Sequence, residues 1–284
     1  MSLAVETRPV DRPLLAASFN YLKPMKDRAA NYTYEPPAGV PRSNVVPDPH
    51  RVDIYDGRAI DASVDREGFA LVEHHSAVRD FFNDEEVRSV YYPEAERLLK
   101  AQTGASRVFI FDHTTRRRSP DEILDSGRRG EGQPRGPVGR VHVDHTERSG
   151  PQRVRDLLGD EADGLLKHRF AVVNVWRPTK GPLEDAPLGV CDARSVAPQD
   201  LVETDLVYRD RKGETYSVTY SPRHRWYFYP HMRIDEVLLL KCYDSRKDVA
   251  RFSPHSAFEN PLAPANAPPR ESIELRAFLF FEDQ

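Results

Sequence analysis

The sequence predicts a mainly β protein with flanking helices, built as a sandwich or jelly-roll barrel with the helices packed outside. Two observations support this fold class. Beyond residue 105, short apolar runs alternate with turn residues, and one long amphipathic segment precedes them. The 284 residues are 39% hydrophobic and 30% charged, which is typical of a globular protein with a full core. We expect one domain over residues 1–284, with the β core in residues 105–284.

The first 50 residues are rich in proline and polar residues and end in the run PPAGVPRSNVVPDPH. We expect residues 1–50 to form an extended N-terminal arm that wraps over the surface without regular structure. Acidic residues and prolines stand where a secretory signal needs a basic start and an unbroken apolar region. No apolar run approaches the roughly 20 residues that cross a bilayer. We therefore expect a cytoplasmic protein that has no membrane partner.

One helix is predicted in the segment DEEVRSVYYPEAERLLKAQTG, residues 84–104. Asp84 can cap its start, and Gly104 ends it. Pro93 is expected to kink the helix or split it in two. Apolar residues recur at three- and four-residue spacing, as on the buried face of a helix, at Val87, Tyr91, Ala95, Leu98 and Leu99.

The rest of the pattern is nearly all strand, in short apolar runs bounded by turn residues. A second helix is expected only around residues 154–158. The loop over residues 126–137 and the segment over residues 149–167 both flank His142, so we expect them to be candidate lids. The predicted strands are residues 52–55, 69–73, 107–111, 140–143, 170–176, 188–192, 216–220, 226–229, 237–243 and 273–281.

Charge and cysteine content exclude some classes of protein. A net charge of -4 provides no general affinity for nucleic acid. The arginine clusters at 116–118 and 128–129 are short and lie near acidic residues, so we interpret them as solvated loops. A domain of this size does not need a disulfide, and we expect Cys191 and Cys242 to be free, buried thiols.

Candidate metal ligands lie in the segment GRVHVDHT, residues 139–146. Side chains two apart in a strand point the same way, so His142 and Asp144 share a face. One imidazole and one carboxylate are two of the three ligands in the 2-His-1-carboxylate triad of non-haem iron(II) sites. An H-x-D pattern alone is common, so the assignment of an iron site also requires a third ligand and an anchor for a co-substrate.

The C-terminal part of the chain offers both. His255, in RFSPHSAF, lies near the start of a predicted strand and supplies a second imidazole. Further on, in RESIELR, Arg270 and Ser272 face the same side of a strand. A guanidinium and a hydroxyl in this arrangement can together bind one carboxylate.

Other histidines compete for these roles. His231 also ends a predicted strand, but no Arg and Ser follow it at a similar spacing, so we prefer His255. His145 would point to the opposite face from Asp144 and is expected to pack in the core or behind the ligands. The adjacent His74 and His75 have no carboxylate at ligand spacing, and we expect them to be surface or core residues.

The pattern H-x-D, a distant His and R-x-S, together with VHVDHT, NVWRP, PLGVCDARSV and PRESIELRAF, resembles the Fe(II)/2-oxoglutarate-dependent oxygenase superfamily. Within it, the chain is similar to a hydroxylase/desaturase family of secondary-metabolite clusters. The resemblance implies a double-stranded β-helix (a cupin-like jelly roll). It implies that His142, Asp144 and His255 bind Fe(II), and that Arg270 with Ser272 binds the distal carboxylate of 2-oxoglutarate.

The implied reaction uses O2 to oxidise an unactivated C–H bond of a small metabolite by hydroxylation, desaturation or oxidative cyclisation. The long separation between Asp144 and His255 implies an insertion, which residues 182–212 could contain. Two alternatives stay open. One is a non-catalytic jelly-roll binding protein, and the other is a zinc hydrolase, whose H-x-H-x-D-H motif is broken here by Arg140.

Four further residues are candidates for contact with the substrate or with the metal ligands. Asn174, Trp176 and Arg177 lie in the apolar run FAVVNVWRP, where polar groups either satisfy buried backbone groups or reach into the barrel. Tyr227 either lines the cavity or fills the core.

Overall fold

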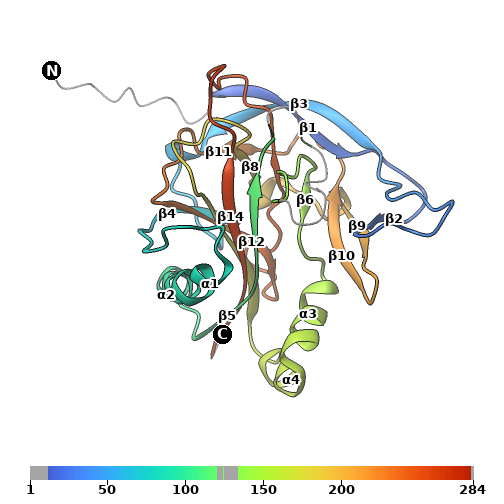
Figure 1. Ribbon diagram of the computed structural model, residues 1–284. Coiled ribbons are helices and arrows are strands. Elements are labelled where there is room, and N and C mark those ends of the chain that lie inside the picture. The colour runs from blue at the N-terminus through green and yellow to red at the C-terminus, as the bar shows by residue number, and fades with distance from the viewer. Residues whose placement is uncertain (1–11, 120–123, 125–133, 283–284) are drawn as a thin grey trace.

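Two β-sheets form the body of the protein in this computed structural model, which describes residues 12–119, 124 and 134–282. Figure 1 shows strands through the centre and along the top of the view, with the helices at its left and lower edges. The mainly β architecture with flanking helices is therefore confirmed. None of the helices in the described stretches is long and apolar enough to cross a membrane.

The smaller sheet has five antiparallel strands. Apolar residues of its outer face, including Val173, Val175 and Leu275, pack against the helical layer. Its inner face is apolar at one end of the strands and polar at the other, where the functional residues gather. Its strands, in spatial order, are β4 (Phe69–Glu73), β12 (Glu236–Asp244), β7 (Phe170–Pro178), β14 (Glu271–Phe280) and β5 (Arg107–Arg117).

The larger sheet has nine strands. It curls back on itself, as a parallel bridge shows between Asn20 of its first strand and Arg140, next to the strands in the middle of the sheet. Its strands, in spatial order, are β1 (Leu15–Leu22), β3 (Pro47–Asp56), β11 (Trp226–Phe228), β8 (Leu188–Cys191), β13 (His255–Ala257), β6 (His142–Val143), β10 (Lys212–Val218), β9 (Leu201–Val207) and β2 (Ala29–Tyr32).

The expectation that residues 1–50 lack regular structure is wrong. Strands β1, β2 and the start of β3 lie in this segment, and β1 and β2 form the two edges of the nine-stranded sheet. The signal was present in LAASFNYL, where Leu15, Ala17, Phe19 and Tyr21 alternate and are all buried. Phe19 stacks on Trp226 with ring centroids 4.2 Å apart, so this arm is part of the core.

The predicted helix begins one residue away from the expected cap. Asn83, rather than Asp84, accepts hydrogen bonds from the backbone N–H groups of Glu85 and Glu86. A π-helical turn precedes Pro93, but the chain stays helical without a break from Asp84 to Thr103, so the expected split is not observed. Gly104 ends the helix in the left-handed conformation (φ 73°). The segments are α1 (Asp84–Glu86), η2 (Val87–Tyr91) and α2 (Tyr92–Thr103).

The second expected helix is also present, as α3 (Ser149–Leu158), and α4 (Ala162–Leu165) follows it. The region that was expected to hold an insertion, residues 182–212, contains β8, β9 and two short turns of helix. The 3₁₀ turns of the described chain are η1 (Gly57–Ala59), η3 (Gly159–Glu161), η4 (Ala193–Ser195) and η5 (Pro198–Asp200).

The interior between the sheets is built from side chains of both. Trp176, Leu238 and Leu240 of the five-stranded sheet pack with Leu188 and Val190 of the nine-stranded sheet. Cys191 and Cys242 are buried free thiols, as predicted. This apolar layer ends where polar side chains of β7 and β14 face β6 and β13.

Candidate metal centre and co-substrate site

Three side chains from two neighbouring strands converge in the interior. His142 of β6 and His255 of β13 are direct cross-strand partners, with ring centroids 4.5 Å apart. Asp144 follows two residues after His142, and its Oδ1 lies 3.6 Å from His142 Nε2. One ligand atom from each of the three residues lies within 4.8 Å of the other two. The structure therefore brings together the triad expected from residues far apart in the sequence.

Backbone carbonyls orient both imidazole rings. His142 Nδ1 lies 2.7 Å from the carbonyl oxygen of Arg140, and His255 Nδ1 lies 3.1 Å from that of Ser253. A carbonyl oxygen only accepts hydrogen bonds, so each Nδ1 carries the proton and each Nε2 keeps its lone pair. Burial, with the neighbouring His255, lowers the pKa of His142 to about 3, which keeps this ring neutral. Both rings are prepared to act as metal ligands.

Asp144 is held as an anion by two donors on the opposite sheet. Its Oδ2 accepts hydrogen bonds from Asn174 Nδ2 at 2.8 Å and from Arg276 Nε at 3.1 Å. Burial alone would raise the pKa of Asp144, but the charge of Arg276, with the hydrogen bond from Asn174, holds it well below its usual range. Because both donors bind Oδ2, Oδ1 remains directed toward the histidines.

Arg276 also forms an ion pair with Glu274 and donates to Thr114 Oγ1 at 3.1 Å. These partners fix the guanidinium of Arg276 in place. Analysis of the sequence did not identify Arg276 as a residue that holds Asp144. The period-two spacing of Arg270, Ser272, Glu274 and Arg276 on β14 is the signal that these side chains share one face.

Arg270 is buried, with 2% of its surface exposed, and it lies on the same inner face. Its Nε donates to Ser272 Oγ at 3.1 Å, and its Nη1 donates to the carbonyl of Ala186 at 2.8 Å. Its guanidinium also stacks over Trp176, 4.9 Å from the ring centroid. Burial, with the nearby charge of Arg116, lowers its pKa to about 9, so an anion bound here would stabilise the charged form. Because Ser272 accepts from Arg270, its own proton is available to the same anion.

Two imidazole nitrogens and one carboxylate oxygen form the donor set of non-haem iron(II) sites. Comparison with known proteins agrees with this chemistry. The chain is 32% identical to the hydroxylase/desaturase efuI of Hormonema carpetanum, over 98% of this chain and 99% of that protein. It is 32% identical to the Fe(II)/2-oxoglutarate-dependent dioxygenase nvfI of Aspergillus novofumigatus, over 88% of this chain and 90% of that protein.

The chain belongs to the Fe(II)/2-oxoglutarate-dependent oxygenase family. A solved structure of the iron and alpha-ketoglutarate-dependent endoperoxidase NvfI superimposes with a TM-score of 0.84 at 30% identity, covering 95% of this chain and 99% of that one. The family described as "Oxidoreductase/YMDC permease-like domain" also matches residues 19–280. The protein is therefore an oxygenase with the jelly-roll fold of its relatives, and its cofactors are Fe(II), 2-oxoglutarate and O2. These similarities favour it over a zinc hydrolase or a non-catalytic binding protein.

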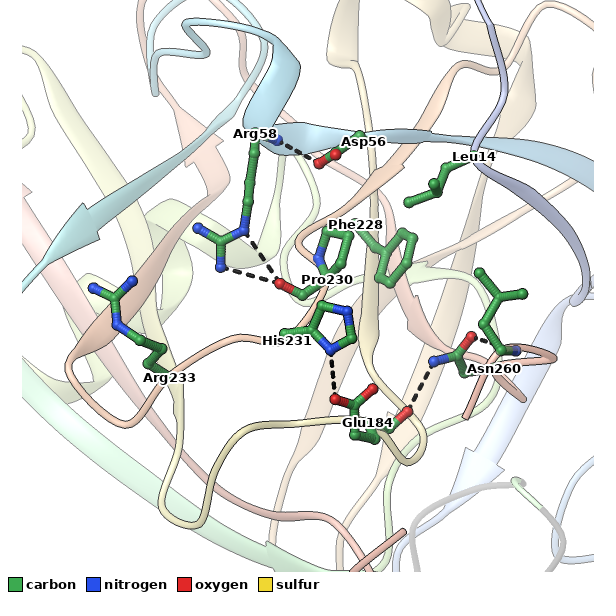
Figure 2. A pocket seen from close by; sticks show the side chains of 10 residues that line it. Leu14, Asp56, Arg58, Glu184, Phe228, Pro230, His231, Arg233 and Asn260 are labelled. Atoms are coloured by element: carbon green, nitrogen blue, oxygen red, sulfur yellow. Dashed lines mark hydrogen bonds and ion pairs between the residues drawn. The ribbon is translucent and has the colours of Figure 1, made fainter. Parts of the chain in front are cut away.

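His231, the alternative to His255 as third ligand, does not lie near the other two ligands. Figure 2 shows His231 in a surface pocket, where its Nδ1 contacts Glu184 beside Pro230 and Asn260. The side chain of His231 is 71% exposed, and none of the triad residues lines this pocket. His145, two residues beyond the end of β6, is buried with its ring against Phe111, as expected of a packing residue.

The four candidate contact residues of the oxygenase divide into two groups. Asn174 and Trp176 face the interior, where they contact Asp144 and Arg270. Arg177 points to the opposite face, so the alternative in which it reaches into the barrel is wrong. It stacks on Tyr91 and donates to the carbonyls of two residues in neighbouring loops, His74 and Ile234.

Tyr227 is 3% exposed and packs in the apolar layer between the sheets, where its hydroxyl accepts a hydrogen bond from Arg225 at 2.6 Å. The candidate lid over residues 126–137 lies mostly outside the described residues. The prediction that the arginine cluster at 116–118 is a solvated loop is wrong, because Arg116 and Arg117 end β5 and Arg116 is buried.

Proposed function

We propose that His142 Nε2, Asp144 Oδ1 and His255 Nε2 hold Fe(II), and that Arg270 with Ser272 binds the distal carboxylate of 2-oxoglutarate. The observation that carries this assignment is the orientation of the triad. Two backbone carbonyls turn both Nε2 atoms inward, and Asn174 with Arg276 leaves Oδ1 of Asp144 for the metal. A buried guanidinium with a serine hydroxyl lies on the sheet that faces them.

The bound iron and 2-oxoglutarate supply the oxidising chemistry, in which O2 is consumed and succinate and carbon dioxide are released. The side chains of this chain bind and orient these groups and exclude water from them. We infer that the reaction is hydroxylation, desaturation or oxidative cyclisation at an unactivated C–H bond of a small secondary metabolite. The hydroxylase/desaturase efuI supports the first two reactions by its name, and the endoperoxidase NvfI shows that a similar chain performs another oxidation.

We also infer that residues 1–284 form a single oxygenase domain, in which strands β1 to β4 extend the two sheets beyond the core expected in residues 105–284. Packing of β1 into the nine-stranded sheet supports inclusion of the N-terminal part in that domain. A cytoplasmic location and the absence of nucleic-acid and membrane partners stay predictions from the sequence.

An anaerobic titration with Fe(II) and 2-oxoglutarate tests the assignment. The chelate should produce a weak visible charge-transfer band that saturates at one equivalent of iron. His255→Ala should abolish the band, because two remaining ligands hold a labile divalent metal poorly.

His231→Ala is the matched control, since it removes an exposed histidine that has no contact with the triad. A normal band in His255→Ala, or its loss in His231→Ala, would overturn the ligand assignment.

A further inference from the structure

Arg116 is a buried cation beside the co-substrate site that the proposed function leaves without a role. It lies on β5 directly across from Ser272 of β14. Cross-strand partners in a sheet point to the same face, so its side chain enters the interior with those of Arg270 and Glu274. Arg117, the next residue, points outward and pairs with Glu271.

The described residues provide Arg116 with a hydrogen bond but with no counter-ion. Its Nη1 donates to the carbonyl oxygen of Gly136 at 2.8 Å, and no described carboxylate forms an ion pair with it. Burial lowers the pKa of Arg116, and the carboxylate of Glu274, which forms no ion pair with it, offsets this only in part. The residue is buried, with 9% of its surface exposed. A neutral carbonyl does not balance a buried guanidinium.

The other interior charges have partners once the cofactors are bound. Arg276 pairs with Glu274, and Arg270 would pair with the distal carboxylate of 2-oxoglutarate. Asp144 and the other carboxylate of 2-oxoglutarate would balance the two charges of the iron. Asp112 also contacts Arg276, but its side chain is 51% exposed and is solvated by water. Of the three arginines on the inner face of β5 and β14, namely Arg116, Arg270 and Arg276, only Arg116 is left without a counter-charge among the described residues.

We propose that Arg116 binds a carboxylate of the substrate, so that the oxygenase acts on small molecules that carry a carboxylic acid. This inference rests on the proposed function. A guanidinium presents a planar pair of donors that matches a carboxylate, and one unbalanced charge calls for a monoanion rather than a phosphate dianion. Trp176, on which Arg270 stacks, places an apolar side chain of the buried core next to this group of charges.

Matched pairs of acids and amides test the charge requirement. The enzyme is loaded anaerobically with Fe(II) and 2-oxoglutarate and titrated calorimetrically with benzoate and benzamide, cinnamate and cinnamide, and indole-3-acetate and indole-3-acetamide. The members of a pair are alike in size and differ in charge. We expect wild type to bind at least one acid about tenfold or more tightly than its amide, as one charge-assisted bidentate contact provides.

Arg116→Met should abolish this preference, and Arg117→Met, which removes an outward-pointing charge from the same strand, should keep it. If Arg116→Met does not fold, Arg116→Lys carries the test. It keeps the charge but loses the planar pair of donors, so the preference should fall several-fold.

Equal binding of every acid and its amide in wild type would overturn the inference, and so would a preference that survives in Arg116→Met. A tenfold loss of 2-oxoglutarate affinity in Arg116→Met would also overturn it, because Arg116 would then be a contact of the co-substrate. Absence of the charge-transfer band in wild type refutes the proposed function as well. A normal band without any preference for acids refutes this inference alone.

Discussion

Replacement of Asn174 by leucine should weaken iron binding without destabilising the metal-free protein. The variant loses the hydrogen bond from Asn174 Nδ2 to Asp144 Oδ2, which is 2.8 Å long. A hydrogen bond to a charged group contributes about 2 kcal/mol, which corresponds to roughly a 30-fold change in an equilibrium constant. Arg276 still holds the same oxygen, so we expect a loss of iron affinity of about tenfold to 30-fold.

The stability of the metal-free protein should respond differently. Asn174 is fully buried, and its Oδ1 has no hydrogen-bond partner among the described residues. Burying such an oxygen costs about 1–3 kcal/mol. Leucine removes this cost together with the favourable bond to Asp144, so the two changes offset each other. The free energy of unfolding should stay within about 1 kcal/mol of wild type.

The assay is anaerobic competition for Fe(II) against a chromophoric chelator, together with urea denaturation of the metal-free protein. Asn260→Leu is the matched control, because Asn260 donates to the Glu184 carbonyl at 2.9 Å, in the surface pocket of Figure 2. Iron affinity within about twofold of wild type in Asn174→Leu would refute the role of this contact. Equal losses in both variants would refute it too.

Three further changes separate the roles of buried side chains. Arg270→Met should raise the dissociation constant of 2-oxoglutarate about tenfold or more and leave iron affinity unchanged, which titration of the charge-transfer band measures. Arg177→Met should lower the free energy of unfolding by about 2 kcal/mol, because it leaves buried carbonyls unpaired, and both cofactors should still bind. Burial lowers the pKa of His145 to about 4, below the roughly 6.5 of an unfolded chain, so protons favour the unfolded state. The contribution of His145 to the free energy of unfolding is present above about pH 6.5 and is lost as pH falls toward 4. At pH ~5 this contribution should be about 2 kcal/mol smaller than at neutral pH. Urea denaturation of His145→Phe should therefore depend less on pH than that of wild type.

Local patterns in the sequence were sufficient for many elements. The short apolar run at residues 69–73, bounded by turn residues, predicted β4, and the spacing from Val87 to Leu99 predicted the helix on the outer face. The alternation of Leu15, Ala17, Phe19 and Tyr21 was equally readable, but the prolines around it favoured an irregular arm. That segment is a strand because β3 pairs with it along its whole length, and such pairing is a long-range contact that composition does not reveal.

The sequence by itself determined which chemical groups are present and which neighbours share a face. Period-two spacing places His142 beside Asp144 and Arg270 beside Ser272, because this depends only on strand geometry. Only the tertiary structure decided that His255, rather than His231, is paired with His142, since that choice depends on which distant strands hydrogen bond. Closure of the two sheets also turned Asn174 and Arg276 toward Asp144 and buried Arg116 in the interior, because burial and charge pairing depend on what packs across the barrel.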